Sequence, residues 1–286
     1  MTGEGSYVGR SFMRHVGGAC RVDEVSVRDE AWRTHDFSPY DAVLHVAAIV
    51  HQPRIQDRDL YFQVNRDLPR EICRKAVQEG VRQFVFMSTM AVYGRSPSYE
   101  GAGEITPATE CRPGTPYGES KHAAEGDLLE LRARHPFRLG IVRAPMVYGA
   151  ECPGNYFRRL MWMGRRLPVF PSLRDNRLSM IGIRNLCELL RLIIQQEAEG
   201  VHCPDDLDAY GTQDRLGAIA RAFDRDIRMA RIPAPFSGWL ALERLGSLYG
   251  DLYYGGGFDH FNGRYVVDSF QTTVAALATG LRLQAR

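Results

Sequence analysis

Asp41-Ala-Val-Leu-His-Val-Ala-Ala-Ile49 is an apolar run suited to a β-strand that is buried on both faces. Two further runs of this kind follow along the chain, Val81–Met87 and Arg138–Arg143. The intervals between them carry helical patterns, Arg58–Gly80 and Tyr117 to about His135. Strands that alternate with helices imply right-handed crossovers and a parallel sheet. The sequence therefore predicts an α/β fold built on a doubly wound parallel sheet.

Small and hydroxyl-bearing residues stand where two of these strands end. Ala47 and Ala48 end the first, and Ser88 and Thr89 follow the second. In an open α/β sheet, ligands bind in the crevice outside the carboxyl ends of the strands, and small residues leave room there. Tight packing of a helix on the sheet would explain the two alanines equally well. We expect a ligand crevice at this edge of the sheet.

The chain opens with a glycine loop, Thr2-Gly3-Glu4-Gly5-Ser6-Tyr7-Val8-Gly9, and an apparent helix, Arg10 to about Val16, follows it. Glycines between a strand and a helix let the backbone approach a pyrophosphate, which the helix N-terminus then holds. The apolar strand that should precede such a loop is absent, and Ser6 stands at the middle glycine position. Taken alone, the loop fits an ordinary turn as well. We expect the first strand of the sheet to be missing, because of a late recorded start or a truncated gene product.

The second strand of the sheet is expected at Val22–Val27, with Arg28 and Asp29 directly after it. A carboxylate in this place normally binds the ribose hydroxyls of a dinucleotide. Asp29 is therefore a candidate, whereas Arg28 could favour a 2′-phosphate. These two residues leave NAD and NADP both open.

Thr115-Pro-Tyr-Gly-Glu-Ser-Lys121 carries the residues best suited to proton transfer. A helix capped by Thr115 would place Tyr117 and Lys121, four residues apart, on one face. An ammonium about 4 Å from a phenol is worth about 4 kcal/mol at a surface-like dielectric, or about three pKa units. Tyr117 would then be a usable acid/base. A solvated helix face with a partly packed tyrosine is the alternative, although the chain contains only two lysines, Lys75 and Lys121.

After Gly149 the pattern of the sequence changes, and the segments that follow are looped, aromatic and rich in arginine. We expect residues 1–149 with about 178–200 to form a dinucleotide-binding domain. Residues from about 150 to 177 and from 201 to 286 are expected to form a small substrate-binding lid. Cation-rich, aromatic loops suit a diphosphate and a flat base, although a solvated basic surface is also consistent.

Composition excludes several classes of protein. A net charge of +2 on 286 residues, with scattered basic residues, argues against a nucleic-acid partner. The six cysteines form no C-x-x-C pair and no metal-ligand spacing with the histidines, so no metal site is predicted. No apolar run approaches the length of a membrane span, so we expect no membrane association and a cytoplasmic location.

Together these pieces resemble the extended short-chain dehydrogenase/reductase family, in its NAD-dependent sugar-nucleotide epimerase/dehydratase branch. The matching motifs occur in the family's order over residues 1 to about 200: Thr2-Gly3…Gly9, His45-Val-Ala-Ala48, Asn65, Ser88-Thr89…Val92-Tyr-Gly94, Tyr117-x-x-x-Lys121 and Arg143…Val147-Tyr-Gly149. The resemblance implies a Rossmann-like sheet and bound NAD, with NADP not excluded. A segment with Asn155 and Arg177 resembles the substrate part of UDP-hexose 4-epimerase-like members.

The resemblance also implies roles for individual residues. Tyr117 would remove a proton from a sugar hydroxyl, Lys121 would hold the nicotinamide ribose and depress the pKa of Tyr117, and Thr89 would align the same hydroxyl. Asn155 and Arg177 would hold the diphosphate of a nucleotide sugar. Other residues would surround the dinucleotide: Gly3, Ser6, Tyr7, Val8, Gly9, Asp29, Ala47, Ala48, Asn65, Ser88 and Pro145.

The resemblance favours an epimerase of the UDP-hexose 4-epimerase kind and leaves two alternatives. A sugar-nucleotide reductase or dehydratase is one, although dehydratases normally carry an Asp-Glu pair where this chain has Met90 and Ala91. A non-catalytic dinucleotide-binding sensor is the other. Met146 replaces an asparagine that many epimerases use on the substrate phosphates, which leaves the substrate open. A homodimer is a family expectation.

Overall fold

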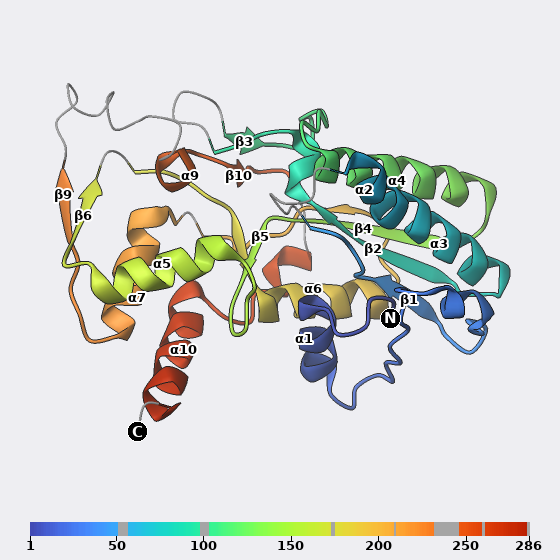
Figure 1. The fold of residues 1–286 in the computed structure, drawn as a ribbon, viewed down its shortest axis with the longest axis horizontal. Coiled ribbons are helices and arrows are strands. Elements are labelled where there is room, and N and C mark those ends of the chain that lie inside the picture. The colour runs from blue at the N-terminus through green and yellow to red at the C-terminus, as the bar shows by residue number, and fades with distance from the viewer. Residues whose placement is uncertain are drawn as a thin grey trace.

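A parallel four-stranded sheet, in the order β1-β2-β4-β8, forms the centre of the molecule (Figure 1). The strands are β1 (Ala42–His45), β2 (Gln83–Thr89), β4 (Arg138–Ala144) and β8 (Gly200–His202). Every residue of β2 except its last is buried, because helices cover both faces. The predicted parallel α/β sheet is thereby confirmed. The computed structural model describes residues 1–50, 57–97, 103–172, 175–208, 210–231, 246–258 and 261–284.

In the described part of the chain, isolated bridges of Thr2 and Val25 extend this sheet beyond β1. Thr2 forms parallel bridges with His45 on one side and with Val25 on the other. Its N–H donates to Leu44 at 3.0 Å, and its carbonyl accepts from the N–H of Val46 at 3.0 Å. The next two segments that pair in the sheet, Val25 and then β1, therefore lie on opposite sides of Thr2. This change of side makes Thr2 a topological switch point.

The expected second strand is much shorter than predicted. Of Val22–Val27, Val25 alone forms a bridge, and its partner is Thr2. A cavity of about 540 Å³ lies beyond Met1, between Val22 and Ala42. Strand pairing needs a neighbour of matching length, and the rest of this stretch has none within the described residues.

Two layers of helices cover the sheet. α1 (Tyr7–Val16) packs against α6 (Ile183–Gln195) on one face, and Phe12 and Leu186 belong to the same buried cluster. α4 (Pro116–Arg134) and α3 (Leu68–Gln78) cover the other face. α2 (Arg58–Phe62) precedes α3, and a π-helical turn, Gln63–Asp67, interrupts the helix that the sequence predicts over 58–80. Short 3₁₀ helices lie at Glu30–Thr34 and Met90–Tyr93.

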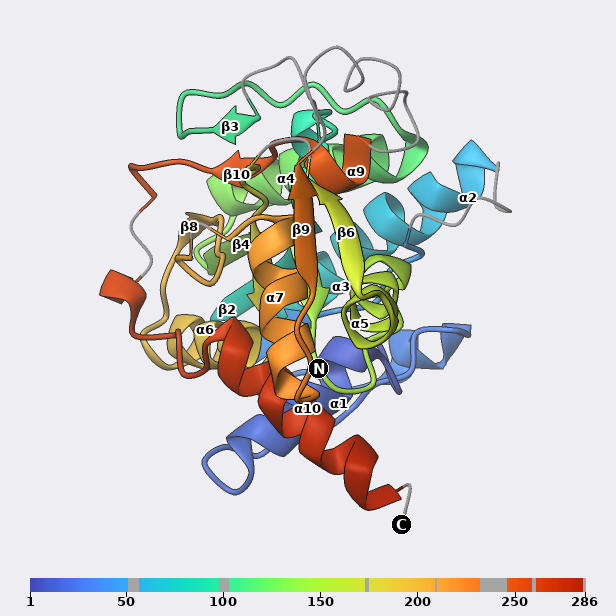
Figure 2. The same cartoon turned by 90° about the vertical axis from the view of Figure 1, so that its left-hand side faces the viewer.

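Much of the C-terminal half forms a second lobe, which lies beside the sheet in Figure 1 and faces the viewer in Figure 2. Its strands β6 (Val169–Ser172) and β9 (Arg228–Arg231) pair in parallel. Its own buried cluster includes Phe157, Leu216 and Phe270. The helices of the lobe are α5 (Asn155–Arg166), α7 (Thr212–Ala222), α9 (Gly246–Tyr249) and α10 (Phe270–Gln284). A 3₁₀ turn at Phe261–Gly263 packs against the buried cluster of the main sheet instead.

Two small parallel pairs connect the lobe with the sheet. β5 (Met146–Tyr148) pairs with β7 (Met180–Gly182), and β3 (Glu104–Ile105) pairs with β10 (Tyr253–Tyr254). β8 belongs to the main sheet although the predicted boundary placed residues from 201 onward in the lid. The other proposed boundaries remain predictions.

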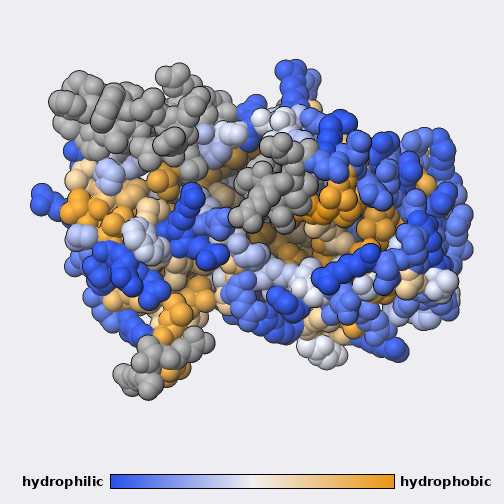
Figure 3. All heavy atoms as spheres, in the orientation of Figure 1, coloured by the Kyte–Doolittle hydropathy of each residue, from blue (hydrophilic) through white to orange (hydrophobic). Residues whose placement is uncertain are grey.

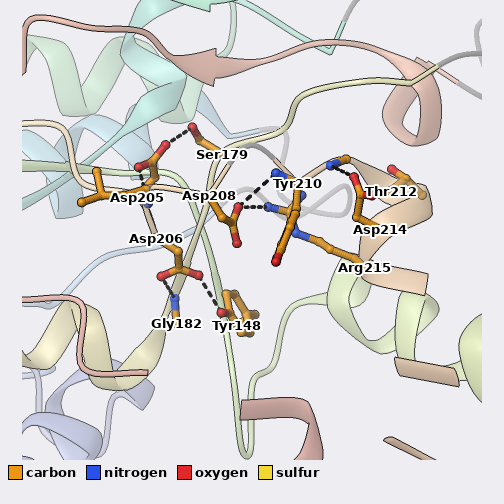
Figure 4. A network of polar contacts seen from close by, with 12 residues as sticks. Tyr148, Ser179, Gly182, Asp205, Asp206, Asp208, Tyr210, Thr212, Asp214 and Arg215 are labelled. Carbon is orange, nitrogen blue, oxygen red and sulfur yellow. Dashed lines mark hydrogen bonds and ion pairs between the residues drawn. The ribbon is translucent and has the colours of Figure 1, made fainter. Parts of the chain in front are cut away.

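Three aspartates, Asp205, Asp206 and Asp208, lie where the two lobes meet and hydrogen-bond to residues around them (Figure 4). Asp206 accepts hydrogen bonds from the Gly182 N–H at 2.9 Å and from the Tyr148 hydroxyl at 2.6 Å. Burial raises the pKa of Asp206 to about 6. Asp208 pairs with the fully buried Arg215 of α7 at 3.2 Å. These contacts hold β5, β7 and α7 in fixed relation.

Candidate active site

A cavity of about 490 Å³ lies beside the switch point of the sheet. Four residues predicted to bind a cofactor line it, and all come from the glycine loop or the end of β1: Gly3, Ser6, Ala47 and Ala48. Arg28 and Val27 line its other wall. Residues distant in sequence thus converge on one concave site at the carboxyl edge of the strands.

The glycine loop has the conformation that a close approach to a ligand requires. Gly3 has φ +116°, and a Cβ there would lie 2.7 Å from the backbone nitrogen of Ala47. Gly5 has φ +69°, and a Cβ there would meet nothing within 4 Å. Both positions favour glycine, and Gly5 leaves open space before the N-terminus of α1. The loop therefore fits a pyrophosphate, which the backbone N–H groups of α1 would hold.

Ser6, at the middle glycine position of the loop, caps α1 with its side chain. Its Oγ accepts a hydrogen bond from the Gly9 N–H at 3.1 Å and caps α1. Gly9 is buried, and a Cβ there would lie 2.6 Å from that oxygen. One N–H of the helix terminus is therefore already satisfied, and those of Tyr7 and Val8 precede it along the helix.

Asp29 and Tyr7 are both predicted to contact the dinucleotide, and their side chains have different surroundings. Asp29 Oδ1 accepts from the Ala31 N–H at 3.0 Å and caps a 3₁₀ helix. Among the described residues that line the cavity, Arg28 is present and Asp29 is not. The ring of Tyr7 lies near Gly149, away from the loop. The backbone of Tyr7 is therefore the part that can contact a ligand in the loop.

Asn65 holds the end of β1 to the helix of the Tyr-Lys motif. In the π-helical turn, its Oδ1 accepts from the Ile49 N–H at 2.9 Å. Its Nδ2 donates to the Ile49 carbonyl at 3.0 Å and to Ser120 Oγ at 3.2 Å. Ser120 Oγ in turn donates to the Tyr117 carbonyl at 2.9 Å. The partners of Asn65 lie on other elements, and these bonds orient the start of α4.

Thr89 and Tyr117 meet at the carboxyl end of β2. Thr115 Oγ1 caps α4 by accepting from Gly118, as predicted. Burial raises the pKa of the Tyr117 phenol, while the Thr89 side chain, hydrogen-bonded to it, acts in the opposite direction. The ring of Tyr61 lies edge-on to Tyr117, with centroids 6.4 Å apart. A phenol and an alcohol are therefore paired in a largely desolvated position.

Lys121 does not have the electrostatic role expected from the sequence. Its Nζ donates to the Met87 carbonyl at 2.7 Å and lies 4.4 Å from the Phe86 ring centroid. Burial lowers the pKa of Lys121 to about 7, and the pKa of Tyr117 is raised rather than depressed. The prediction of an ammonium that lowers the phenol pKa is thus wrong for this structure. A buried ammonium needs an acceptor, and the nearest is backbone.

A buried charge network next to the site was not predicted. Ser88 Oγ donates to Glu125, whose carboxylate forms a bidentate pair with Arg143, the shortest N···O distance being 2.6 Å. Arg143 Nη1 also donates to Tyr93 Oη at 2.9 Å. Ser88 therefore bonds to α4 and leaves Thr89 as the hydroxyl facing Tyr117. Glu125 stands four residues after Lys121, a spacing that could have indicated the same helix face.

The sequence pattern of the NAD dependent epimerase/dehydratase family matches residues 6–167, more than half of the 286-residue chain. The chain belongs to this family. The predicted membership is confirmed, and NAD is the cofactor of the NAD-dependent epimerase/dehydratase family. When bound, NAD would lie against the glycine loop, Ala47 and Ala48.

Several curated relatives share part of their sequence with this family member. A UDP-glucose 4-epimerase from Vibrio cholerae is 26% identical over 197 residues, covering 67% of this chain and 60% of that protein. The N-acetyl-alpha-D-glucosaminyl-diphospho-ditrans,octacis-undecaprenol 4-epimerase of Escherichia coli O157:H7 is 24% identical over 233 residues, covering 79% and 69%. A dTDP-glucose 4,6-dehydratase from Streptomyces griseus is 33% identical over 137 residues, covering 46% and 40%.

Solved structures share the fold along the whole chain. MoeE5 in complex with UDP-glucose and NAD has a TM-score of 0.70 at 17% identity, covering 100% of this chain and 98% of that chain. A dTDP-4-dehydrorhamnose reductase from Clostridium acetobutylicum has a TM-score of 0.69 at 17% identity, covering 98% of each. Likeness at this identity concerns the fold.

The predicted substrate ligands lie in the C-terminal lobe of this family member. Asn155 is the first residue of α5 and is exposed. The exposed guanidinium of Arg177 lies over Tyr253, 4.0 Å from the ring centroid, and its backbone N–H donates to Asp251. Pro145 is buried between β4 and β5. The roles of these residues remain predictions.

Proposed function

We propose that this chain is an NAD-dependent epimerase that acts on a sugar carried on a nucleoside diphosphate, as a UDP-hexose 4-epimerase does. The pairing of the Thr89 and Tyr117 side chains carries the proposal. These residues are 28 positions apart and both are partly buried, and a sensor has no use for two paired hydroxyls there. The names of the Vibrio cholerae and Escherichia coli relatives support the same reaction class.

In this proposal the two hydroxyls move one proton. The Tyr117 oxygen accepts the proton of a sugar hydroxyl and later returns it, while Thr89 donates to the same sugar oxygen and fixes its position. When bound, NAD supplies a reversible hydride acceptor. The ketone that results is planar at the oxidised carbon, so the sugar can be reduced on either face after it turns. Net inversion then requires no second cofactor.

The raised pKa of Tyr117 sets a condition on this cycle. A neutral phenol is ready to donate a proton, but it must lose its own proton before it can accept one. Lys121 lies one helical turn away and holds its Nζ on Met87. In this structure Lys121 therefore does not lower that pKa, and the proposed cycle needs Tyr117 to lose its proton before it can accept one from the sugar hydroxyl.

The diphosphate is proposed to bind where the lobe presents cationic and amide side chains. Arg177 is held against Tyr253 and keeps its guanidinium edge exposed. A planar guanidinium can bind two phosphate oxygens at once. Asn155 stands at the N-terminus of α5, a 12-residue helix whose first N–H groups also favour an anion.

The test is interconversion of UDP-glucose and UDP-galactose, and of their N-acetyl forms, without added NAD. Tyr117→Phe should abolish nearly all turnover, at least about 10²-fold by the usual size of acid/base effects, while NAD binding is kept. Tyr40→Phe is the matched control, because Tyr40 donates to Asp23 at the opposite cavity. Full activity of Tyr117→Phe would refute the proposal. Turnover that consumes NADH or NADPH stoichiometrically would show a reductase instead.

A further inference from the structure

The outer face of α5 carries four arginines around one tryptophan. The helix buries Phe157, Leu160 and Gly164 in the C-terminal lobe and packs on α7. Its opposite face exposes Arg158, Arg159, Trp162, Arg165 and Arg166. Trp162 is 59% exposed, and in the described part of the chain it is the one aromatic among the exposed large hydrophobic side chains. The helix thus presents a basic face with an indole at its centre.

These arginines are not neutralised by neighbours. None of the four forms an ion pair with a described carboxylate, whereas exposed arginines elsewhere commonly do, as Arg112 and Arg134 show. Arg165 lies over the Phe223 ring at 4.8 Å instead. Glu151, a carboxylate that lines the groove beside these arginines, is paired with Arg14. The local charge is therefore available to an outside anion.

An apolar groove runs beside the basic face. Its volume is about 350 Å³, and it lies between α5 and α10. Met161, Trp162, Leu277 and Leu281 form its apolar lining, and Arg158, Arg165 and Arg166 also line it. Leu281 is 39% exposed. In Figure 3, hydrophilic residues gather over α5 and hydrophobic residues over α10.

We propose that this α5–α10 face docks on the surface of an anionic lipid membrane. An indole and leucines suit the boundary between headgroups and acyl chains, and guanidinium groups suit the lipid phosphates around them. Charge complementarity alone would also fit a nucleic acid. The apolar groove favours lipid, because a phosphodiester backbone offers nothing to bury against it.

The contact is peripheral and does not depend on the proposed catalytic function. No helix among the described residues is long and apolar enough to cross a bilayer. The expectation of no membrane association was drawn from the lack of a spanning segment, and a helix face lying on the surface needs none. Binding of this kind weakens with salt, since it depends on exposed charges.

Sedimentation of the full chain with vesicles tests the proposal. Vesicles of phosphatidylcholine with about 30% phosphatidylglycerol should bind at least about fivefold more protein than pure phosphatidylcholine, and 0.5 M salt should release it. Arg158→Glu with Arg166→Glu should reduce binding at least about tenfold, and the two lysine replacements should retain it within about twofold. Trp162→Ser should weaken binding several-fold. Arg74→Glu, an exposed site on α3, is the control and should bind as the wild type does.

Equal binding to neutral and anionic vesicles would overturn the proposal, as would wild-type binding by the doubly reversed variant. Tighter binding to a duplex oligonucleotide than to anionic vesicles at the same salt would also overturn it, in favour of a nucleic-acid partner. Thermal unfolding shows whether each variant is folded. Should the reversed variant unfold, Trp162→Ser and the salt dependence decide the matter by themselves.

Discussion

Lys121→Met should change how the stability of the protein depends on pH. The Lys121 side chain is 1% exposed, and burial lowers its pKa from 10.5 to about 7. Between these two values the unfolded chain holds a proton that the folded chain has lost, so stability rises with pH. The contribution of Lys121 is complete above pH 10.5 and is lost as the pH falls through about 7. Methionine has no proton to exchange and a similar length.

The size of the effect follows from the shift. A change from 10.5 to about 7 is about 3.5 pKa units, or about 5 kcal/mol in total. Of this, about 2 kcal/mol develops between pH 7 and pH 9, where folded Lys121 is largely neutral and a free lysine still charged.

Urea unfolding of the cofactor-free protein at pH 7, 8 and 9 measures this difference. The free energy of unfolding of the wild type, minus that of Lys121→Met, should grow by about 2 kcal/mol over the range. Lys75→Met is the control, because Lys75 is the only other lysine and pairs with Glu79 on the surface. Its profile should run parallel to the wild type. A parallel profile for Lys121→Met would refute the assignment of a buried, pKa-lowered amine.

Three further substitutions test the site and its supports. Glu125→Ala should lower the free energy of unfolding by about 3 kcal/mol or more, because the mostly buried Arg143 loses its carboxylate; a loss under about 1 kcal/mol in urea unfolding would contradict the network. Gly3→Ala should cost about 1–3 kcal/mol and weaken NAD binding in a titration, because its φ of +116° and the Ala47 nitrogen at 2.7 Å exclude a Cβ; unchanged stability and affinity would contradict the cradle. Gly126→Ala in α4, where a Cβ would meet nothing within 4 Å, should instead stabilise the protein by about 0.5–1 kcal/mol in the same unfolding assay. A lower melting temperature for Gly126→Ala would show that the helix position is more constrained than this.

The order of strands and helices could be predicted from the sequence because it depends on local patterns. Apolar runs ending in Ala47 and in Ser88 mark buried strands, and Thr115 marks the start of α4, where its hydroxyl caps Gly118. The spacing of Tyr117 and Lys121 places both on one helix, and it holds in the structure. Asn65 could be recognised as a residue needing partners because it interrupts a helical pattern.

What could not be predicted depends on partners far away in the chain. The Nζ of Lys121 bonds to Met87, 34 residues earlier, and no helical spacing reveals a backbone acceptor on another element. Val22–Val27 has a strand pattern, but its pairing depends on how much chain lies beside it. The Asp29 carboxylate satisfies a local N–H group instead of facing the cavity. In each case the hydrogen-bond donors and acceptors that lie nearby in the fold decide where the side chain or strand pairs.

Three hydrogen bonds connect Met1–Gly3 to Asp23 and Val25: Met1 N to Asp23 O, Val25 N to Met1 O and Gly3 N to Val25 O. These few hydrogen bonds should open without disturbing β2 and β4, which pair along seven residues. In deuterated water, the amides of Gly3 and Val25 should exchange through small local openings, while those of Val85 and Ile141 should wait for global unfolding. The amides next to the glycine loop would then exchange before those of the central strands. A dinucleotide bound against this loop should slow their exchange most.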